Sequence, residues 1–131
     1  MSASERVGTR SSGCDMVETP HPVAVIGAGP CGLAAVVALG QAGIPAIVFD
    51  RGCVASSIAG YPTYITFFST AEKISVGGFP FEVATEKPTR RDALAYYRTV
   101  VTHFGLTVRQ YESVDAIARD GVGFAVRSTP I

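Results

Sequence analysis

The 131-residue chain lacks an excess of charge of either sign, because Lys and Arg together number 11 and Asp and Glu together also number 11. A formal net charge of zero removes the electrostatic argument for a nucleic-acid partner or an anionic membrane surface. Long apolar runs are missing too, since the stretch Cys31–Gly40 is interrupted by glycine and is too short to cross a bilayer. We therefore expect no nucleic acid and no membrane as partner.

Cysteine is scarce and scattered. The chain has 3 cysteines, Cys14, Cys31 and Cys53, with no Cys-x-x-Cys pair and no His/Cys cluster at metal-ligand spacing. This pattern argues against a disulfide framework and against a metal site, and it favours a reducing compartment. The N-terminus also lacks the apolar segment of a secretory signal. We expect a cytoplasmic protein without a metal ion.

The length suits one domain, and an apolar content of 47% is enough to build a core. Residues 1–22 are polar and rich in serine, and they end in the stiff segment Thr19–Pro22. We therefore predict that residues 1–22 form a disordered N-terminal extension and that the fold begins at Val23.

The first part of the predicted fold is a β-α-β unit. Val23–Ile26 and Ala46–Phe49 are short, fully apolar runs, which is typical of buried parallel strands. Between them, Leu33–Ala42 is predicted as a helix of small residues. Gly43 is placed to end that helix in the left-handed conformation, and Pro45 follows as a stop.

The remainder is predicted as a long loop, a helix, a strand and an antiparallel hairpin. Residues 52–88 show no clean period, apart from one short helix expected near Cys53–Ala59. Thr89 and Asp92 have the spacing of a capping box, and the helix that they begin should end at Gly105. The last predicted elements are the strand Leu106–Arg109 and a hairpin of Ser113–Arg119 with Gly123–Arg127, which turns at Asp120-Gly121.

A glycine motif directly follows the first predicted strand. Gly27, Gly29 and Gly32 have the G-x-G-x-x-G spacing of a dinucleotide-binding turn. The first glycine allows the tight turn, the second lets the backbone approach a pyrophosphate, and the third permits close packing of helix on strand. The helix N-terminus then offers N–H groups to the phosphates. The chain is therefore predicted to have an α/β fold that opens with a Rossmann-like unit.

An acidic residue stands where such a fold places its ribose acceptor. Asp50 follows the second predicted strand, and a carboxylate there accepts hydrogen bonds from ribose hydroxyls. The same negative charge disfavours a ligand with a 2′-phosphate. FAD and NAD therefore remain as candidates, and the motif alone does not separate them.

More extended stretches carry a resemblance to a known family. The turn Gly27–Gly32, in its form with Pro30, is similar to the FAD turn of thioredoxin-reductase-like flavoproteins. Between about Val23 and Val126 the chain resembles the YpdA-type bacillithiol disulfide reductases. That resemblance is carried by Ser57-Ile58, Tyr61–Thr63, Thr66–Thr70, Gly77–Phe81 and Lys87–Arg90.

The resemblance implies an FAD enzyme that takes electrons from NADPH and reduces a low-molecular-weight disulfide such as oxidised bacillithiol. It implies that the FAD is lined by Gly27, Gly29, Pro30, Cys31, Gly32 and Asp50. Ala28 and Arg51 are further candidates for binding the cofactor, although Arg51 could equally be a solvated surface residue. The resemblance makes Cys31 the redox cysteine and places the Thr66–Thr70 loop toward the flavin. Members of this family are much longer, so residues 23–131 would be the N-terminal portion of an FAD-binding domain, without the NADPH-binding domain.

Several alternatives stay open from the residues. Cys31 could be a small residue filling the turn, since the helix dipole and a bound pyrophosphate act on its thiol in opposite directions. The loop aromatics could form a wall beside the flavin or a small core under a long loop. The chain could be a non-catalytic fragment, or part of another FAD enzyme such as a flavin monooxygenase. A homo-oligomer also stays open.

Overall fold

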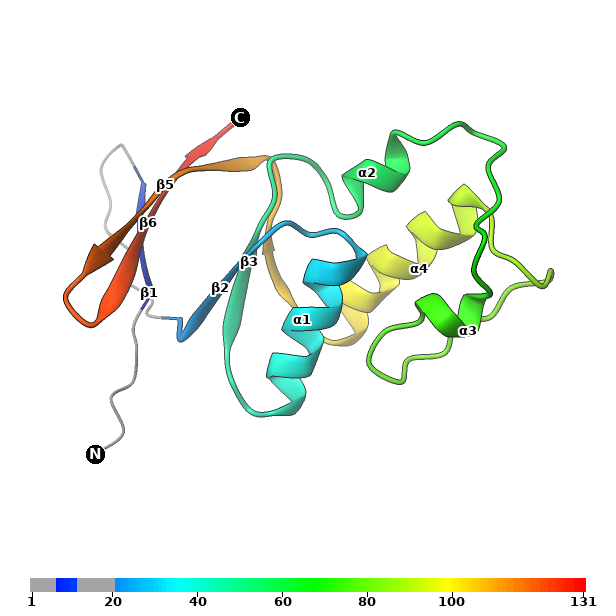
Figure 1. The fold of residues 1–131 in the computed structure, drawn as a ribbon, viewed down its shortest axis with the longest axis horizontal. Helices are drawn as coiled ribbons and strands as arrows, with labels where there is room; N and C mark the ends of the chain where they lie inside the picture. The colour runs from blue at the N-terminus through cyan, green and yellow to red at the C-terminus, as the bar shows by residue number, and fades with distance from the viewer. Residues whose placement is uncertain (1–6, 12–20) are drawn as a thin grey trace.

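The computed structural model describes residues 7–11 and 21–131 as a layered α/β fold with two three-stranded sheets. One sheet is parallel and has the order β2-β3-β4, and the other has the order β1-β6-β5 (Figure 1). Helices α1 and α4 lie beside the parallel sheet, and the second sheet lies at the far side of the molecule from α4 (Figure 1).

The predicted β-α-β unit is confirmed. β2 (Val23–Ile26) pairs in parallel with β3 (Ala46–Phe49), with Val23 opposite Ala46 and Ile26 opposite Phe49. The helix between them, α1 (Pro30–Gln41), begins earlier than predicted. Proline is favoured at the first position of a helix, because its missing N–H would have no partner there. Gly43 adopts the expected left-handed conformation, with φ of +76°.

The segment between β3 and the next long helix has more structure than the sequence predicted. It contains α2 (Ser56–Ala59), which lies inside the predicted short helix, and α3 (Ala71–Ile74), which was not predicted. Both have 4 residues, which is too short to leave a helical period in the sequence.

Helix α4 (Arg90–His103) follows the predicted capping box. The Thr89 hydroxyl oxygen accepts from the Asp92 N–H at 3.3 Å, and the Asp92 carboxylate accepts from the Thr89 N–H at 2.9 Å. Gly105 ends the helical segment with φ of +61°. β4 (Thr107–Arg109) then adds to β3 in parallel, with Ile47 opposite Thr107.

The C-terminal hairpin is confirmed as well. β5 (Glu112–Asp120) and β6 (Gly123–Pro130) pair antiparallel, and Gly121 in the connecting turn has φ of +62°. The pairing is irregular between Val114 and Ala116.

The prediction of a disordered extension over residues 1–22 is wrong at one stretch. β1 (Val7–Ser11) pairs in parallel with β6, with Val7 opposite Phe124 and Ser11 opposite Ser128. Strand pairing draws on backbone groups, and β6 offers its second edge to such a partner. Composition alone therefore could not exclude a strand here. Residues 1–6 and 12–20 lie outside the described residues.

The parallel sheet separates two apolar clusters. The larger cluster packs α1 and α4 against one face of the sheet and includes Leu33, Val48 and Tyr97. The smaller cluster, on the other face, joins Ile47 and Phe49 to Val126 of β6. Adjacent residues of β3 thus point to opposite faces, as a strand covered on both sides requires. Over the described ranges, no helix is long and apolar enough to cross a membrane.

Candidate functional site

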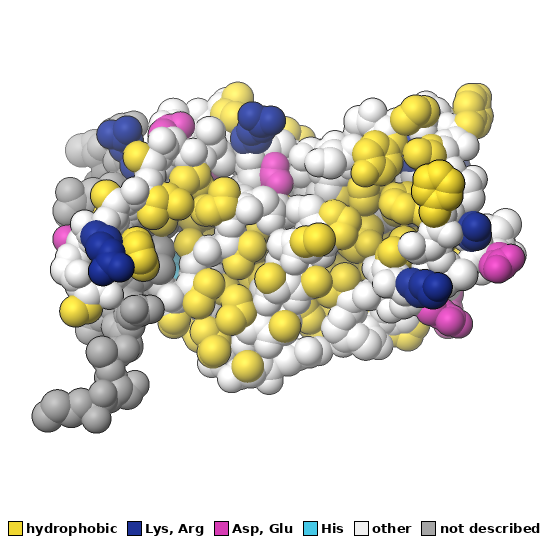
Figure 2. Space-filling model, in the orientation of Figure 1, with side chains coloured by type: hydrophobic (Ala, Val, Ile, Leu, Met, Phe, Trp, Pro, Cys, Tyr) yellow, Lys and Arg dark blue, Asp and Glu magenta, His cyan; other side chains and the backbone are white. Residues whose placement is uncertain are grey.

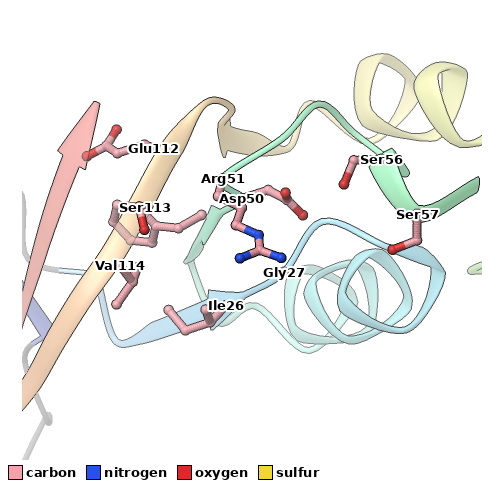
Figure 3. Close-up of a pocket in the computed structure, with 10 residues that line it drawn as sticks. Ile26, Gly27, Asp50, Arg51, Ser56, Ser57, Glu112, Ser113 and Val114 are labelled. Carbon is pink, nitrogen blue, oxygen red and sulfur yellow. The ribbon is translucent and has the colours of Figure 1, made fainter. Parts of the chain in front are cut away.

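A cavity of ≈ 360 Å³ opens at the carboxyl ends of β2 and β3 (Figure 3). This edge of a parallel α/β sheet is where such folds bind ligands. Three segments that are far apart in the sequence form its walls: the end of β2 with the glycine turn, the end of β3 with α2, and the start of β5. The lining residues are Ile26, Gly27, Phe49, Asp50, Arg51, Ser56, Ser57, Glu112, Ser113 and Val114.

The three positions of the glycine motif differ in how strongly the fold requires glycine there. Gly27 has φ of +107°, and its N–H donates to the Phe49 carbonyl at 2.7 Å, which ties the turn to β3. A Cβ added at Gly32 would lie 1.9 Å from the Gly27 carbonyl oxygen, so the helix can approach the turn only because this residue is glycine. At Gly29 an added Cβ would meet no protein atom within 4 Å. Among the described residues, nothing therefore requires glycine at position 29.

The N-terminus of α1 has no protein cap. Gly29 is the N-cap residue and makes no side-chain hydrogen bond, Pro30 has no N–H, and the first turn contains no acidic residue. The first intrahelical hydrogen bond is donated by the Leu33 N–H to the Gly29 carbonyl at 2.9 Å. The Cys31 and Gly32 N–H groups precede that bond, so they are free to donate to an anion.

The carboxylate, the N–H and the carbonyl of Asp50 all form hydrogen bonds within the protein. Its carboxylate accepts from the Ala28 N–H at 2.7 Å through Oδ2 and from the Gly52 N–H at 2.7 Å through Oδ1. Its own N–H donates to the Arg109 carbonyl at 3.0 Å, and its carbonyl accepts from the Glu112 N–H at 2.9 Å. The side chain predicted to accept the ribose hydroxyls thus joins the glycine turn to the turn that follows β3.

Arg51 reaches over the cavity. Its guanidinium group lies between Ile26 and Asp50 in Figure 3, and the residue is exposed. On the opposite wall, the Glu112 Oε1 atom accepts from Arg109 at 3.2 Å and from the buried Ser128 hydroxyl at 2.5 Å. Glu112 is therefore held by its own partners, whereas the Arg51 guanidinium group extends over the cavity (Figure 3).

The cysteines differ in their surroundings. Cys31 is exposed and is the second residue of α1, whereas Cys53 is half-buried in the turn before α2. Tyr97 of α4 lies near Cys31. Burial raises the pKa of Tyr97 to about 12, and negative charge on Tyr96 and Cys31 contributes further. Tyr97 therefore stays protonated and donates to the Ile74 carbonyl at 2.9 Å. Cys14 lies outside the described residues.

The loop aromatics divide into two groups. Phe67, Phe79 and Phe81 pack against the larger core, and the Phe81 ring stacks on Tyr96 with a centroid distance of 4.1 Å. Tyr64 and Phe68 are each 96% exposed. Figure 2 shows hydrophobic side chains gathered on the surface over the α2 end of the molecule. Within the Thr66–Thr70 loop, Phe67 therefore packs on the core whereas Phe68 is exposed, so both alternatives for these aromatics stay open.

Most of the predicted cofactor residues come together at this site. Gly27, Asp50 and Arg51 line the cavity, and Gly29 to Gly32 form the adjoining helix N-terminus. Ala28 differs, because its side chain is fully buried and its carbonyl accepts from the Ala55 N–H at 2.9 Å. Among the described residues, no group of three His, Cys, Asp or Glu side chains is placed to hold a metal ion.

The wall formed by Glu112, Ser113 and Val114 was not predicted from the sequence, nor were Ser56 and Ser57. For the wall formed by Glu112, Ser113 and Val114, the sequence did contain a usable signal. The carboxyl ends of neighbouring parallel strands meet at one edge of the sheet, so the segment after a third parallel strand belongs beside the first two.

The chain is similar to bacterial reductases both in sequence and in structure. The chain is 51% identical over 77 residues to bacilliredoxin reductase Bdr of Bacillus subtilis (strain 168), which covers 59% of this chain and 24% of that protein. The bacillithiol disulfide reductase Bdr (YpdA) of Staphylococcus aureus superposes with a TM-score of 0.77 at 39% identity, over 82% of this chain and 35% of that one. The chain thus spans about a quarter to a third of the length of these relatives.

A flavin monooxygenase of Stenotrophomonas maltophilia, a mutant form, superposes with a TM-score of 0.71 at 22% identity, over 80% of this chain and 35% of that one. That likeness concerns the fold alone. The profile of a family described as "Pyridine nucleotide-disulphide oxidoreductase" matches residues 24–130. The β-α-β unit, the glycine turn and these relatives agree, and the chain belongs to the pyridine nucleotide-disulphide oxidoreductase family.

Proposed function

We propose that the site binds FAD and that this chain is the N-terminal part of the FAD-binding domain of an NADPH-dependent disulfide reductase. The observation that carries the proposal is the uncapped N-terminus of α1 beside the cavity at the carboxyl ends of β2 and β3. An adenine dinucleotide needs a concave place for adenosine and N–H donors for its pyrophosphate. The residues present fit both requirements.

The Cys31 and Gly32 N–H groups beside Gly29 would hold the pyrophosphate of the FAD. The cavity, lined by Arg51, Ser56 and Ser57, would hold its adenosine. The open space at Gly29, where even a Cβ would meet nothing within 4 Å, supports this placement.

The reaction proposed for the whole protein is the reduction of a low-molecular-weight disulfide. NADPH, a proton and one disulfide give NADP⁺ and two thiols, and bound FAD supplies the two-electron carrier between them. Cys31 is proposed as the redox cysteine, because it is exposed and is the second residue of α1, beside the proposed pyrophosphate site. Its single thiol would form a mixed disulfide with the substrate. We place this reaction in the cytoplasm.

The experiment that tests the site is a titration of the purified chain with FAD, riboflavin and ADP, followed by flavin fluorescence. We expect the chain to bind FAD and to lose it on gel filtration, because the described residues surround the adenosine more closely than they surround any flavin. ADP should compete with FAD, and riboflavin, which lacks the ADP half, should bind much more weakly. Equal affinity for FAD and riboflavin, or no competition by ADP, would contradict the proposal.

The flavin monooxygenase alternative has less support. Its structural neighbour shares the fold at 22% identity, whereas the reductase of Staphylococcus aureus is 39% identical. A protein that is as long as these reductases and carries this chain as its N-terminal part should consume NADPH in proportion to added disulfide under nitrogen. NADPH consumption that depends on oxygen and an oxygenated product would favour the monooxygenase instead.

A further inference from the structure

We propose that Arg90 is a positioning residue of the nucleotide site. It binds the last residue of α2 and so holds Ser56 and Ser57, which belong to α2, at the wall of the cavity. Arg90 is not among the residues that line the cavity, so it acts on the ligand through α2. This role rests on the proposed binding of an adenine nucleotide.

Helix α2 depends on other elements for its position. It has 4 residues, and its N-cap makes no side-chain hydrogen bond. A single helical turn is not stable in water by itself. The N-cap residue, Ala55, has φ of +56° although it is not glycine, and such a conformation persists only where the surroundings hold it. The place of Ser56 and Ser57 is therefore set by contacts from outside the helix.

The Arg90 side chain provides such a contact at the end of α2. Its Nη2 atom donates to the Ala59 carbonyl at 2.6 Å. Ala59 is the last residue of α2, and carbonyls at the end of a helix have no partner within it. The guanidinium group is charged, so its hydrogen bond is stronger than that of a neutral donor. Arg90 thus ties α2 to the start of α4, beside which it lies in Figure 1.

The backbone at Arg90 holds the chain again a few residues further on. The Arg90 N–H donates to the Ile65 carbonyl at 3.1 Å. Next to these two residues, Thr66 and Thr89 form an isolated antiparallel bridge. Arg90 therefore bonds to both ends of residues 59–65, through its side chain at one end and through its backbone at the other.

The position of Arg90 is unfavourable for α4 itself. Arg90 is the first residue of α4, where the helix dipole disfavours a positive charge. Its Nε atom is buried and has no hydrogen-bond partner, which costs free energy. In the described part of the chain, no acidic side chain forms an ion pair with it. The contacts with α2 and with the chain after it are what offset these costs.

The test compares two ligands, ADP and inorganic pyrophosphate, in NMR titrations of the unaltered 131-residue chain and of Arg90→Met. Methionine keeps an unbranched side chain but has no donor. Without the bond to Ala59, α2 leaves its place in a fraction of the molecules, and the apparent affinity for a ligand that needs α2 falls accordingly. We expect ADP to bind about tenfold more weakly. Pyrophosphate, whose proposed donors belong to α1, should bind unchanged.

Two further variants make the comparison specific. Arg98→Met removes an exposed arginine of the same helix and is the matched control, so it should bind both ligands unchanged. Arg90→Lys keeps a charged donor and should restore part of the ADP affinity. Equal ADP affinity of Arg90→Met and the unaltered chain would overturn the proposal. An equal loss of ADP and pyrophosphate binding would overturn it too, because that result means that the whole fold is loosened.

Amide hydrogen exchange tests the tie without a ligand. In α2 and just after it, the Ala59 and Gly60 N–H groups donate to the Ala55 and Ser56 carbonyls. Both amides should exchange faster in Arg90→Met, whereas the amides of β3 should not change. Unchanged exchange at Ala59 and Gly60 would overturn the role of Arg90.

The remaining outcomes are also decisive. Absence of ADP binding by the unaltered chain would contradict the proposed function, and the exchange at Ala59 and Gly60 would still show whether Arg90 holds α2. If Arg90→Met does not fold, the ratio of ADP to pyrophosphate affinity in Arg90→Lys carries the same test. A ratio equal to that of the unaltered chain would then overturn the proposal.

Discussion

At the scale of single residues, Gly29 and Gly32 differ although they belong to one motif. In Gly32→Ala the new Cβ would overlap the Gly27 carbonyl oxygen, at 1.9 Å, and no rotamer relieves a contact with backbone. The gain in helix propensity, about 1 kcal/mol, is smaller than the strain of about 1–3 kcal/mol. We expect a clear fall in the free energy of unfolding, measured by urea denaturation.

Gly29→Ala should behave differently. Gly29 has φ of −79° and ψ of −179°, which alanine adopts readily, and the new Cβ would meet no protein atom within 4 Å. Stability should therefore change by less than about 1 kcal/mol. FAD affinity should nevertheless fall, because the methyl group stands where the pyrophosphate approaches. Denaturation and FAD titration of the same sample separate the two effects, and retained FAD affinity would exclude this path for the pyrophosphate.

The capping box of α4 predicts a dependence of stability on pH. The pKa of Asp92 lies below its usual value, mainly because its carboxylate accepts from the Thr89 N–H, and next because it accepts from the Thr89 hydroxyl. A lowered pKa in the folded state stabilises the protein above the unfolded-state pKa of about 3.9, and this contribution is lost as the pH falls through the folded-state pKa.

Asp92→Asn should therefore lower the thermal midpoint at pH 7 by the equivalent of about 1 kcal/mol, and the difference from the unaltered chain should shrink at pH 3. Thermal denaturation at the two pH values measures this. Asp120→Asn, the same chemical change at an exposed residue of β5, serves as the control. A difference that stays constant between pH 7 and pH 3 would contradict the assignment.

At the scale of elements, Tyr96 joins α4 to the segment after α3. Its hydroxyl accepts from the Val76 N–H at 2.8 Å and donates to the Phe79 carbonyl at 2.8 Å, and its ring stacks on Phe81. Tyr96→Phe keeps the ring but leaves both backbone groups without this partner. The expected loss is about 1–3 kcal/mol in the free energy of unfolding.

Tyr64→Phe is the matched control, because Tyr64 is 96% exposed and the same atom is removed there. It should change stability by less than about 0.5 kcal/mol. Urea denaturation of both variants compares them directly. Equal stability of the two variants would show that the Tyr96 hydroxyl does not hold the loop.

The elements that could be predicted are those with a strong local signal. β2 and β3 have their predicted bounds, because each is a short apolar run that follows a proline and ends at Gly27 or Asp50. The Thr89 cap and the hairpin turn at Gly121 could likewise be predicted from their residue types. α3 is a single turn without periodicity, and β1 depends on the free edge of β6. Neither is encoded locally.

At the scale of the whole molecule, only part of the candidate site could be predicted. The glycine turn and Asp50 lie in one continuous motif, whereas Ser113 and Val114 reach the cavity only because β4 joins β3. The bonding of Asp50 was also out of reach, because the sequence does not show that the Ala28 and Gly52 N–H groups converge on its carboxylate.

The 131-residue chain by itself should bind a flavin nucleotide without turning over NADPH. Its 131 residues contain one G-x-G-x-x-G motif, which is assigned here to FAD. We expect no steady decrease in absorbance at 340 nm when the purified chain is mixed with FAD, NADPH and a low-molecular-weight disulfide. A full-length bacillithiol disulfide reductase serves as the positive control. Sustained consumption by the isolated chain would place a second nucleotide site within these residues.

The order of strands in the parallel sheet has a consequence for folding kinetics. β3 meets β2 across a short crossover, from Val23 to Ala46, but it meets β4 only after the chain has passed through α4, from Ile47 to Thr107. Closing the longer loop costs more chain entropy, so the first pairing should form earlier. One wall of the cavity follows β4, and ligand binding would therefore report the last stage of folding, which a stopped-flow experiment with a fluorescent adenine nucleotide can time.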